Sequence, residues 1–303
     1  MPSLSSRMVT GLLIVRRIRS RLDSADKVER YVRASRVRPT SYAPPRRLDR
    51  KASFSVDTRH GWDCYGVVPL DSPKPAQQVL YVHGGGFISE ISPVHWSFIA
   101  KIANGAPAEV TVPIYPLAPQ STAAQTLPIA TDITADLIAR VGAENVTLMG
   151  DSAGGNIALG IAQTLRDRGV PQPRQLVLIS PVLDQSKSHP EIASVARYDR
   201  MLSIGGSIAS GLLYAGELDI KNPLISPLYA DLKGLAPMVL FTGTHDLHSL
   251  DARDFAARAS DAEAALDYHE LPEGLHGYPV MPTPEGASAR ARIIALVAGT
   301  AGR

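Results

Sequence analysis

Three residues whose side chains can cooperate in acyl transfer occur in order along the chain: Ser152, Asp246 and His276. Ser152 is the centre of GDSAG, which fits the pattern G-x-S-x-G. A serine hydroxyl is a weak nucleophile at neutral pH unless a base removes its proton, and a third group must orient that base. We therefore expect Ser152 to be the nucleophile, His276 the base and Asp246 the acid that orients it.

Other acids and histidines near these positions fit the roles less well. Asp251 follows Asp246 by five positions, within or near an expected helix, so helix capping or a surface position suits it better. His245 and His248 flank the acid, and His269 lies inside an expected strand, so we expect these histidines to be solvent-exposed or to make structural hydrogen bonds.

The sequence HGGG at residues 83–86 places three adjacent glycines directly after the apolar run VLYV. Ordered glycine loses more backbone freedom than any other residue, so the bare backbone needs a reason. Backbone N–H groups can approach a substrate where side chains are absent, and they stabilise the negative oxygen of a tetrahedral intermediate. We expect the N–H groups of Gly85, Gly86 and Ala153 to form an oxyanion hole, with Gly84 shaping the loop.

HGGG taken alone also fits a plain turn or a phosphate-binding loop. The phosphate loop is disfavoured because neither Lys-Ser nor Lys-Thr follows the glycines and the spacing is not G-x-G-x-x-G. Three residues with ring side chains lie in or near this loop in the sequence. We expect His83 to tie the loop through its imidazole, and we expect Phe87 and Trp96 to line an acyl pocket or to belong to the apolar core.

From residue 52 onward, short apolar runs alternate with longer helical patterns, which is typical of a mostly parallel sheet covered by helices on both faces. Ser152, Asp246 and His276 each follow a predicted strand, so the carboxyl edge of that sheet would collect them. The expected strands are 52–56, 63–69, 79–82, 110–116, 145–149, 175–180, 238–243 and 265–271. The expected helices are 93–105, 122–141, 153–168, 249–260 and 284–299.

One connection is longer than a simple crossover requires. About 55 residues separate the strands that end at 180 and begin at 238. Connections in compact domains are usually much shorter. We therefore expect residues 184–222 to be an insertion that packs on top of the sheet.

The charge of the chain is unevenly distributed. Residues 1–51 carry 14 Lys and Arg against 4 Asp and Glu, whereas residues 52–303 carry 17 against 25, which gives net charges of +10 and −8. The stripe Met8, Leu12, Val15, Ile18 and Leu22 has helical spacing, so we expect one amphipathic helix packed over the body. Peripheral contact with an anionic membrane is the alternative. Nucleic-acid binding is not expected, because no recognition motif accompanies the arginines.

Composition excludes several classes of site and location. The single cysteine, Cys64, leaves no intramolecular disulfide and no multi-thiolate metal site, and we expect neither metal nor cofactor. The run MVTGLLIV is too short to span a bilayer and lacks a small-residue cleavage site after it. We expect a cytoplasmic protein, with membrane association through the N-terminal segment and homodimer formation left open.

Six motifs resemble those of one known family, the hormone-sensitive-lipase-like branch of the α/β-hydrolases. They are HGGGF, YPLAPQ, GDSAGGNIA, SPVLD, GTHDL and EGLHGYPV, in that order, and the resemblance covers roughly residues 52–300. Within the family, the chain resembles most the group of monoterpene lactone hydrolases and acetyl-hydrolases. The family more usually shows YRLAPE, so Pro116 and Gln120 depart from its pattern and put the local packing there in question.

The resemblance implies an α/β-hydrolase catalytic domain over residues 52–303 and a cap built from residues 1–51 and the 184–222 insertion. It also implies hydrolysis of carboxylic esters without a cofactor. We expect short- to medium-chain acyl esters as substrates, through an acyl-serine intermediate. Hydrolysis of lactones or of N- or O-acetyl groups by the same three residues is the alternative, and a non-catalytic ligand receptor is a remote one.

Overall fold

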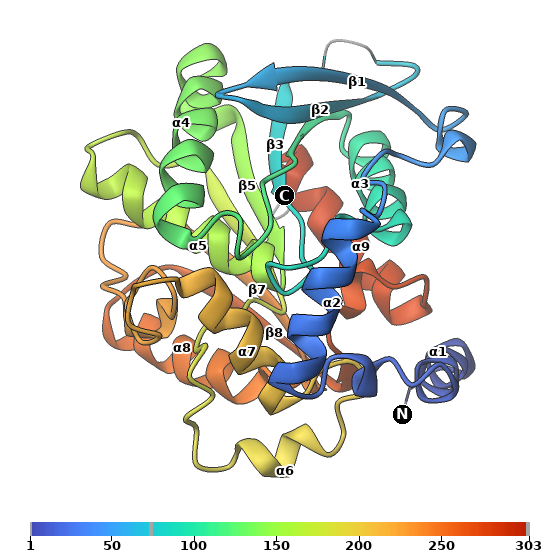
Figure 1. Cartoon of the computed structure of the whole chain (residues 1–303). Coiled ribbons are helices and arrows are strands. Elements are labelled where there is room, and N and C mark those ends of the chain that lie inside the picture. Colours follow the sequence, from blue (N-terminus) through green and yellow to red (C-terminus); the bar gives the residue numbers. More distant parts are fainter. Residues whose placement is uncertain (1, 73–74, 301–303) are drawn as a thin grey trace.

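The computed structural model describes residues 2–72 and 75–300 of the chain. Within these residues the strands form one eight-stranded sheet in the order β1-β2-β4-β3-β5-β6-β7-β8 (Figure 1). β1 pairs with β2, and β2 with β4, in antiparallel fashion, and all further neighbours are parallel. The strands are β1 Ala52–Arg59, β2 Trp62–Pro69, β3 Gln77–Val82, β4 Ala108–Pro113, β5 Val146–Asp151, β6 Gln175–Ile179, β7 Met238–His245 and β8 Leu266–Leu275.

Helices cover both faces of the sheet and divide the buried apolar residues into two clusters. One face carries α3 (Pro93–Gly105) and α9 (Pro284–Ala298), whereas the other carries α4 (Ala123–Val141), α5 (Ala153–Asp167) and α8 (Ser249–Asp261). Neighbouring residues of a strand alternate between the clusters, since Leu80 belongs to one and Tyr81 to the other. The apolar strands are therefore buried on both sides, as the sequence predicts.

The expected elements match the structure closely. All eight strands and all five helices are present, and their ends differ from the expected ones by a few residues. β4 ends at Pro113, earlier than expected, and β8 continues to Leu275, directly before His276. The prediction of a mostly parallel sheet covered on both faces is confirmed.

The long connection between β6 and β7 contains two helices, α6 (Ile192–Ala196) and α7 (Ile204–Ala215). α7 contacts both α4 and α2 (Ala25–Val37). Tyr214 and Ala215 at its end are buried in the cluster that also contains Val28 of α2. The insertion and the N-terminal segment thus meet each other, although they are far apart in the sequence (Figure 1).

The N-terminal segment differs from the prediction of an amphipathic helix that carries the stripe from Met8 to Leu22. α1 spans Leu4–Val15, and the chain then turns at Arg17, whose φ is 49°, before α2 begins. α2, and not α1, packs its apolar residues inward, because Val28 and Val32 are both buried. α1 buries no residue, so the predicted packing of its stripe over the body is wrong. Among the described residues, no helix combines the length and the apolar character needed to cross a membrane.

Candidate active site

Ser152 lies on a sharp turn between β5 and α5. Its φ of 52° and ψ of −119° are strained for a residue with a side chain. The glycines on either side permit this turn. A Cβ at Gly154 would lie 2.0 Å from the carbonyl oxygen of Val82, and one at Gly150 would lie 2.3 Å from the carbonyl oxygen of Gly154. Strand and helix therefore approach too closely for any larger residue, and the side chain of Ser152 is held at the carboxyl edge of the sheet.

The three predicted residues meet at this edge. Nε2 of His276 lies 3.0 Å from Oγ of Ser152, and Nδ1 of His276 lies 3.0 Å from Oδ1 of Asp246. Asp246 follows β7, and His276 follows β8, which pairs with β7 in parallel. All three side chains are buried. The arrangement is suited to proton transfer from the serine to the imidazole, with the carboxylate fixing the ring.

The buried acid and base shift each other's pKa in opposite directions. Burial alone would raise the pKa of Asp246, but the charge and hydrogen bond of His276 and the nearby His248 lower it below its usual value. Burial would lower the pKa of His276, but the charge and hydrogen bond of Asp246, with smaller contributions from Asp199 and Asp151, raise it to about 8. The carboxylate therefore stabilises the imidazolium that forms when the serine loses its proton.

The glycines of HGGG take distinct positions beside the turn. The N–H of Gly84 donates to Oδ1 of Asp151 at 2.9 Å, so this donor is already used. Gly85 and Gly86 have φ of 135° and 61°, and within the described part of the chain no acceptor takes their N–H groups. Ala153 is the first residue of α5, where a helix leaves its N–H groups free. The N–H groups of Gly85, Gly86 and Ala153 are therefore available as donors, whereas that of Gly84 is not.

A comparison with family models identifies the scaffold. Residues 79–280 match the model of a family described as having the alpha/beta hydrolase fold. The chain belongs to this family. The α/β-hydrolase fold predicted from the motifs is thereby confirmed.

Curated relatives of this α/β-hydrolase are named as lipases and esterases. The chain is 34% identical over 219 residues to a triacylglycerol lipase of Mycobacterium tuberculosis, covering 70% of the chain but 45% of the lipase. It is 27% identical to an esterase of Acinetobacter venetianus, covering 63% of the chain and 64% of that protein. It is 29% identical to an acetyl-hydrolase of Streptomyces hygroscopicus, covering 71% and 75%. The match thus spans less than two thirds of the first two relatives.

Among solved structures, a hormone-sensitive lipase from a metagenome library superimposes with a TM-score of 0.82. The two chains are 25% identical, and the superposition covers 97% of each. The α/β-hydrolase therefore shares its overall architecture with a protein of the hormone-sensitive lipase type.

Asp151, which the sequence reasoning did not single out, joins the serine turn to the HGGG loop. Its Oδ1 accepts from the hydroxyl of Tyr81 and from the N–H of Gly84, and its Oδ2 lies 3.2 Å from Nε2 of His95. Burial would raise its pKa, but the charge and hydrogen bond of His95, then Tyr81 and Gly84, lower it to about 2. The sequence feature that could have identified this residue is its place directly before the serine in GDSAGG.

The three rings near the loop have different surroundings. His83 is fully buried, its Nδ1 lies 2.8 Å from the carbonyl oxygen of Gly84, and burial lowers its pKa to about 4. It stacks on Tyr115 and has the structural position expected of it. The ring of Phe87 stacks on that of Tyr214 of α7, with 4.0 Å between the ring centroids. This contact connects the HGGG loop to the insertion.

Trp96 lies in the other apolar cluster, apart from Phe87. Its ring packs edge-on against Tyr65 and Phe54, and its indole N–H donates to the carbonyl oxygen of Tyr42 at 2.9 Å. These contacts give Trp96 a core role. The expectation that it lines an acyl pocket is therefore corrected by its packing.

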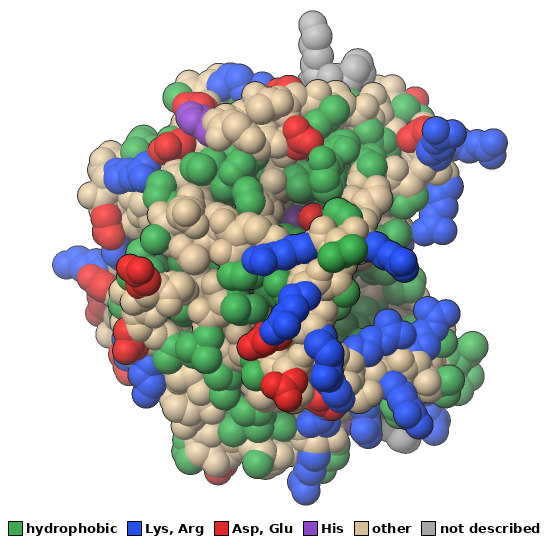
Figure 2. Space-filling model, viewed as in Figure 1, with side chains coloured by type: hydrophobic (Ala, Val, Ile, Leu, Met, Phe, Trp, Pro, Cys, Tyr) green, Lys and Arg blue, Asp and Glu red, His purple; other side chains and the backbone are tan. Residues whose placement is uncertain are grey.

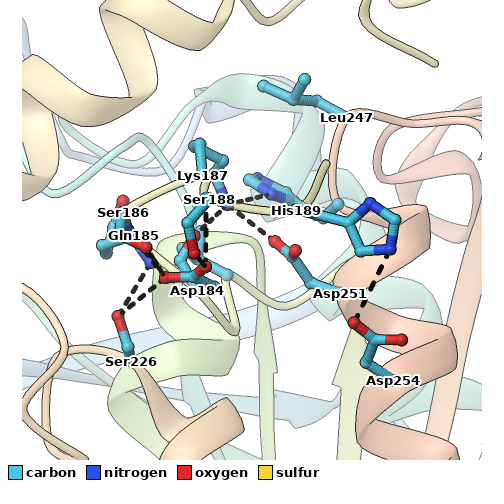
Figure 3. A network of polar contacts seen from close by, with 12 residues as sticks. Asp184, Gln185, Ser186, Lys187, Ser188, His189, Ser226, Leu247, Asp251 and Asp254 are labelled. Carbon is cyan, nitrogen blue, oxygen red and sulfur yellow. Dashed lines mark hydrogen bonds and ion pairs between the residues drawn. The ribbon is translucent and has the colours of Figure 1, made fainter. Parts of the chain in front are cut away.

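A network of buried polar side chains lies beside residues 246–248, here called the acid loop because it begins with Asp246, and Figure 3 shows this network from close by. Nζ of Lys187 lies 3.0 Å from Oδ2 of Asp251 and 3.1 Å from Nδ1 of His248, and it also donates to the carbonyl oxygen of Asp184. The side chains of Lys187 and Asp251 are 0% and 1% exposed. The expected capping or surface role of Asp251 is thus wrong, because this acid is the buried partner of a lysine that comes from the insertion.

A carboxylate from the insertion, Asp199, also holds the loop that carries Asp246. Its Oδ2 accepts from the N–H of Leu247, next to Asp246, and its Oδ1 accepts from the N–H groups of Met201 and Leu202. Burial, and then the charge of Asp246, raise the pKa of Asp199. No sequence motif marks this residue, because its partners come from distant parts of the chain.

Asp246, His248 and His276 place three metal-ligand atoms within 4.8 Å of one another. The polar contacts of these groups oppose metal binding. Nε2 of His276 is bonded to Ser152, and the ammonium group of Lys187 lies 3.1 Å from His248, where it would repel a cation. These contacts therefore disfavour a metal at this cluster.

Proposed function

We propose that this α/β-hydrolase is a serine carboxylesterase of the hormone-sensitive-lipase type that hydrolyses short- to medium-chain acyl esters. The observation that carries the proposal is the hydrogen-bonded chain from Ser152 through His276 to Asp246 at the carboxyl edge of the sheet. The lipase and esterase names of the relatives support the same activity.

In the proposed mechanism, Oγ of Ser152 attacks the ester carbonyl carbon while Nε2 of His276 takes the hydroxyl proton. The new C–O bond gives a tetrahedral oxyanion, and its collapse expels the alcohol, which receives the proton from His276. Water then attacks the acyl-serine by the same route, releases the carboxylic acid and restores the serine. Asp246 holds the imidazolium in both halves of the cycle.

The oxyanion is stabilised by the N–H groups of Gly85, Gly86 and Ala153. The Asp151 contact uses the N–H of Gly84 and leaves these three donors available. Donors that are already in position need no rearrangement when charge develops, and the loss of one such donor typically lowers the rate by about 10² to 10³.

We assign the cap to α2 together with residues 184–222. The cap contacts the site from one side through Phe87, which stacks on Tyr214, and Gly86, where an added Cβ would lie 3.7 Å from Oγ of Ser210. An apolar wall of this kind suits an acyl chain. Phe87 is itself 1% exposed, so the expectation that it lines the acyl pocket is corrected as for Trp96, and we propose that it supports this wall from within the core.

The substrate class within this mechanism has a second candidate. Likeness to an acetyl-hydrolase supports acetyl esters or acetamides, and the motif resemblance adds lactones. Each of these substrates would give an acyl-serine on the same residues. A panel of acyl esters, lactones and acetamides, assayed side by side, ranks them by kcat/KM, and a clear preference for acetamides or lactones would replace the acyl-ester proposal.

The proposed function is tested by Ser152→Ala against p-nitrophenyl acetate and butyrate. We expect the variant to lose at least about 10⁴-fold in kcat while its thermal unfolding stays close to that of the unchanged protein. Undiminished turnover by the variant would refute the proposal. Absence of turnover by the unchanged protein across the whole panel would instead favour a ligand receptor. The cytoplasmic location and the homodimer stay predictions.

A further inference from the structure

α1 contacts the rest of the molecule through the side that carries Ser6, Val9, Thr10 and Leu13, which are half-buried. Oε1 of Glu285, at the start of α9, accepts from the backbone N–H of Ser3 at 2.6 Å, and Oε2 accepts from the hydroxyls of Ser3 and Ser6 at 2.9 and 2.6 Å. Soluble proteins ordinarily dock a surface helix by its apolar stripe. In α1, by contrast, the stripe that contains Leu4, Met8, Leu12 and Val15 does not face the body.

The apolar stripe of α1 consequently faces outward. Leu4, Met8, Leu12 and Val15 recur at intervals of three or four residues and lie on one side of the helix. Their side chains are 77%, 76%, 49% and 79% exposed. Isolated apolar residues are common on protein surfaces, but a continuous exposed stripe of four apolar residues on one side of a helix marks an interaction surface.

Arginines follow the stripe directly. Arg16 and Arg17 are exposed and come immediately after the helix, and Arg21, also exposed, lies six residues beyond its end. All three belong to the segment of 14 Lys and Arg against 4 Asp and Glu. Figure 2 shows Lys and Arg side chains gathered along α2 and toward the edge where α1 lies. An outward apolar stripe bordered by cationic groups is complementary to an anionic lipid surface, whose headgroups attract arginine and whose acyl region accepts apolar side chains.

We propose that α1 lies in the plane of an anionic bilayer, with Leu4, Met8, Leu12 and Val15 inserted between the lipids and Arg16, Arg17 and Arg21 at the headgroups. The inference does not depend on the proposed hydrolysis. A second copy of the chain is the other candidate occupant. Pairing two copies through α1 would bring two strongly basic segments together, and their repulsion disfavours it.

The test is co-flotation of the full chain with vesicles. We expect the unchanged protein to float with phosphatidylcholine vesicles that contain phosphatidylglycerol, but not with phosphatidylcholine alone, and to bind less as salt is raised. The double variant Met8→Ser, Leu12→Ser should bind roughly tenfold or more weakly, because two inserted side chains are lost. The variant Arg16→Gln, Arg17→Gln should also bind more weakly, whereas Arg16→Lys, Arg17→Lys should keep its affinity.

A matched control is the double variant Val56→Ser, Leu70→Ser, which removes apolar side chains that are 55% and 51% exposed elsewhere on the molecule. It should bind like the unchanged protein, and every variant should keep the circular dichroism spectrum and the thermal unfolding midpoint of the unchanged protein, which shows that it is folded. Failure of the unchanged protein to float, or full binding by Met8→Ser, Leu12→Ser, would overturn the proposal. So would a dimer in sedimentation equilibrium that this variant alone abolishes, since the occupant would then be a second copy.

Discussion

The carboxyl edge of the sheet and the N-terminal segment are held in place in very different ways. At the sheet edge, Ser152, Asp246 and His276 follow strands that are paired on at least one side, and Asp151, Asp199 and Lys187 tie the intervening loops with buried hydrogen bonds. In the N-terminal segment, two valines of α2 are buried, and one glutamate accepts the hydrogen bonds that fix the start of α1. Precise positioning is concentrated where the proposed chemistry needs it, and the same substitution should have unequal effects in the two regions.

The largest difference is expected for the acid of the triad. Asp246→Asn should lower kcat on p-nitrophenyl butyrate by about 10⁴, because an amide stabilises the wrong tautomer of His276. The same change at Asp26, an exposed residue of α2, should leave kcat unchanged. Equal losses in the two variants would mean that the N-terminal segment takes part in the chemistry.

Two ion pairs permit the same comparison for stability. Lys187→Met should lower the free energy of unfolding by about 3 to 5 kcal/mol, because it leaves the carboxylate of Asp251 buried without a partner. Lys27 pairs with Asp23 at 2.7 Å, but both side chains are more than a third exposed, so Lys27→Met should cost about 0 to 1 kcal/mol. Urea denaturation of both variants measures the difference.

The double variant Lys187→Met, Asp251→Leu separates charge from packing. It should recover much of the stability lost in Lys187→Met, since no buried charge is then left alone. A double variant as unstable as the single one would show that the fit of the lysine, and not the pairing of its charge, supports the acid loop.

Substitution of glycine by alanine tests how closely neighbouring atoms approach the backbone in each of the two regions. A Cβ at Gly84 would lie 2.3 Å from Oδ2 of Asp151, so Gly84→Ala should displace the HGGG loop and lower kcat by about 10² to 10³. A Cβ at Gly11 in α1 would meet nothing within 4 Å, so Gly11→Ala should leave kcat unchanged. If Gly84→Ala kept full activity, the proposed oxyanion hole would be in the wrong place.

The smallest expected effect is a shift in pH dependence. Neutral His276 is the form that accepts the serine proton, so with its pKa raised to about 8, kcat/KM should rise with pH and level off above about 8. Asp199 contributes to that raised pKa, and Asp199→Asn should move the rising limb to lower pH. The stripe variant Met8→Ser, Leu12→Ser should keep the original profile. An unmoved limb in Asp199→Asn would remove this carboxylate from the electrostatics of the site.

The sequence predicts the residues at the sheet edge well because the patterns that identify them are short stretches of sequence that occur in a fixed order along the chain. Apolar strands alternate with helices, and each candidate residue directly follows a strand, so topology alone brings Ser152, Asp246 and His276 together. The supporting residues are less predictable. Lys187 and Asp199 act on partners about 50 or 60 positions away, and no spacing rule reveals a buried pair between an insertion and a distant loop.

The N-terminal segment was predicted less well for a different physical reason. Helical spacing identifies an apolar face, but it does not say whether that face meets the protein or its surroundings. Glu285 accepts hydrogen bonds from Ser3 and Ser6 at the start of α1, and α2 supplies the valines that pack against the body. Only the three-dimensional arrangement distinguishes these outcomes.

The central claim is that Ser152 is the nucleophile, and labelling with a p-nitrophenyl alkylphosphonate tests it most directly. We predict release of one equivalent of p-nitrophenolate per chain, a mass adduct on the peptide that contains Ser152, and loss of esterase activity in step with labelling. Ser152→Ala should take up no label. An adduct on a different residue, or full activity in completely labelled protein, would contradict the account.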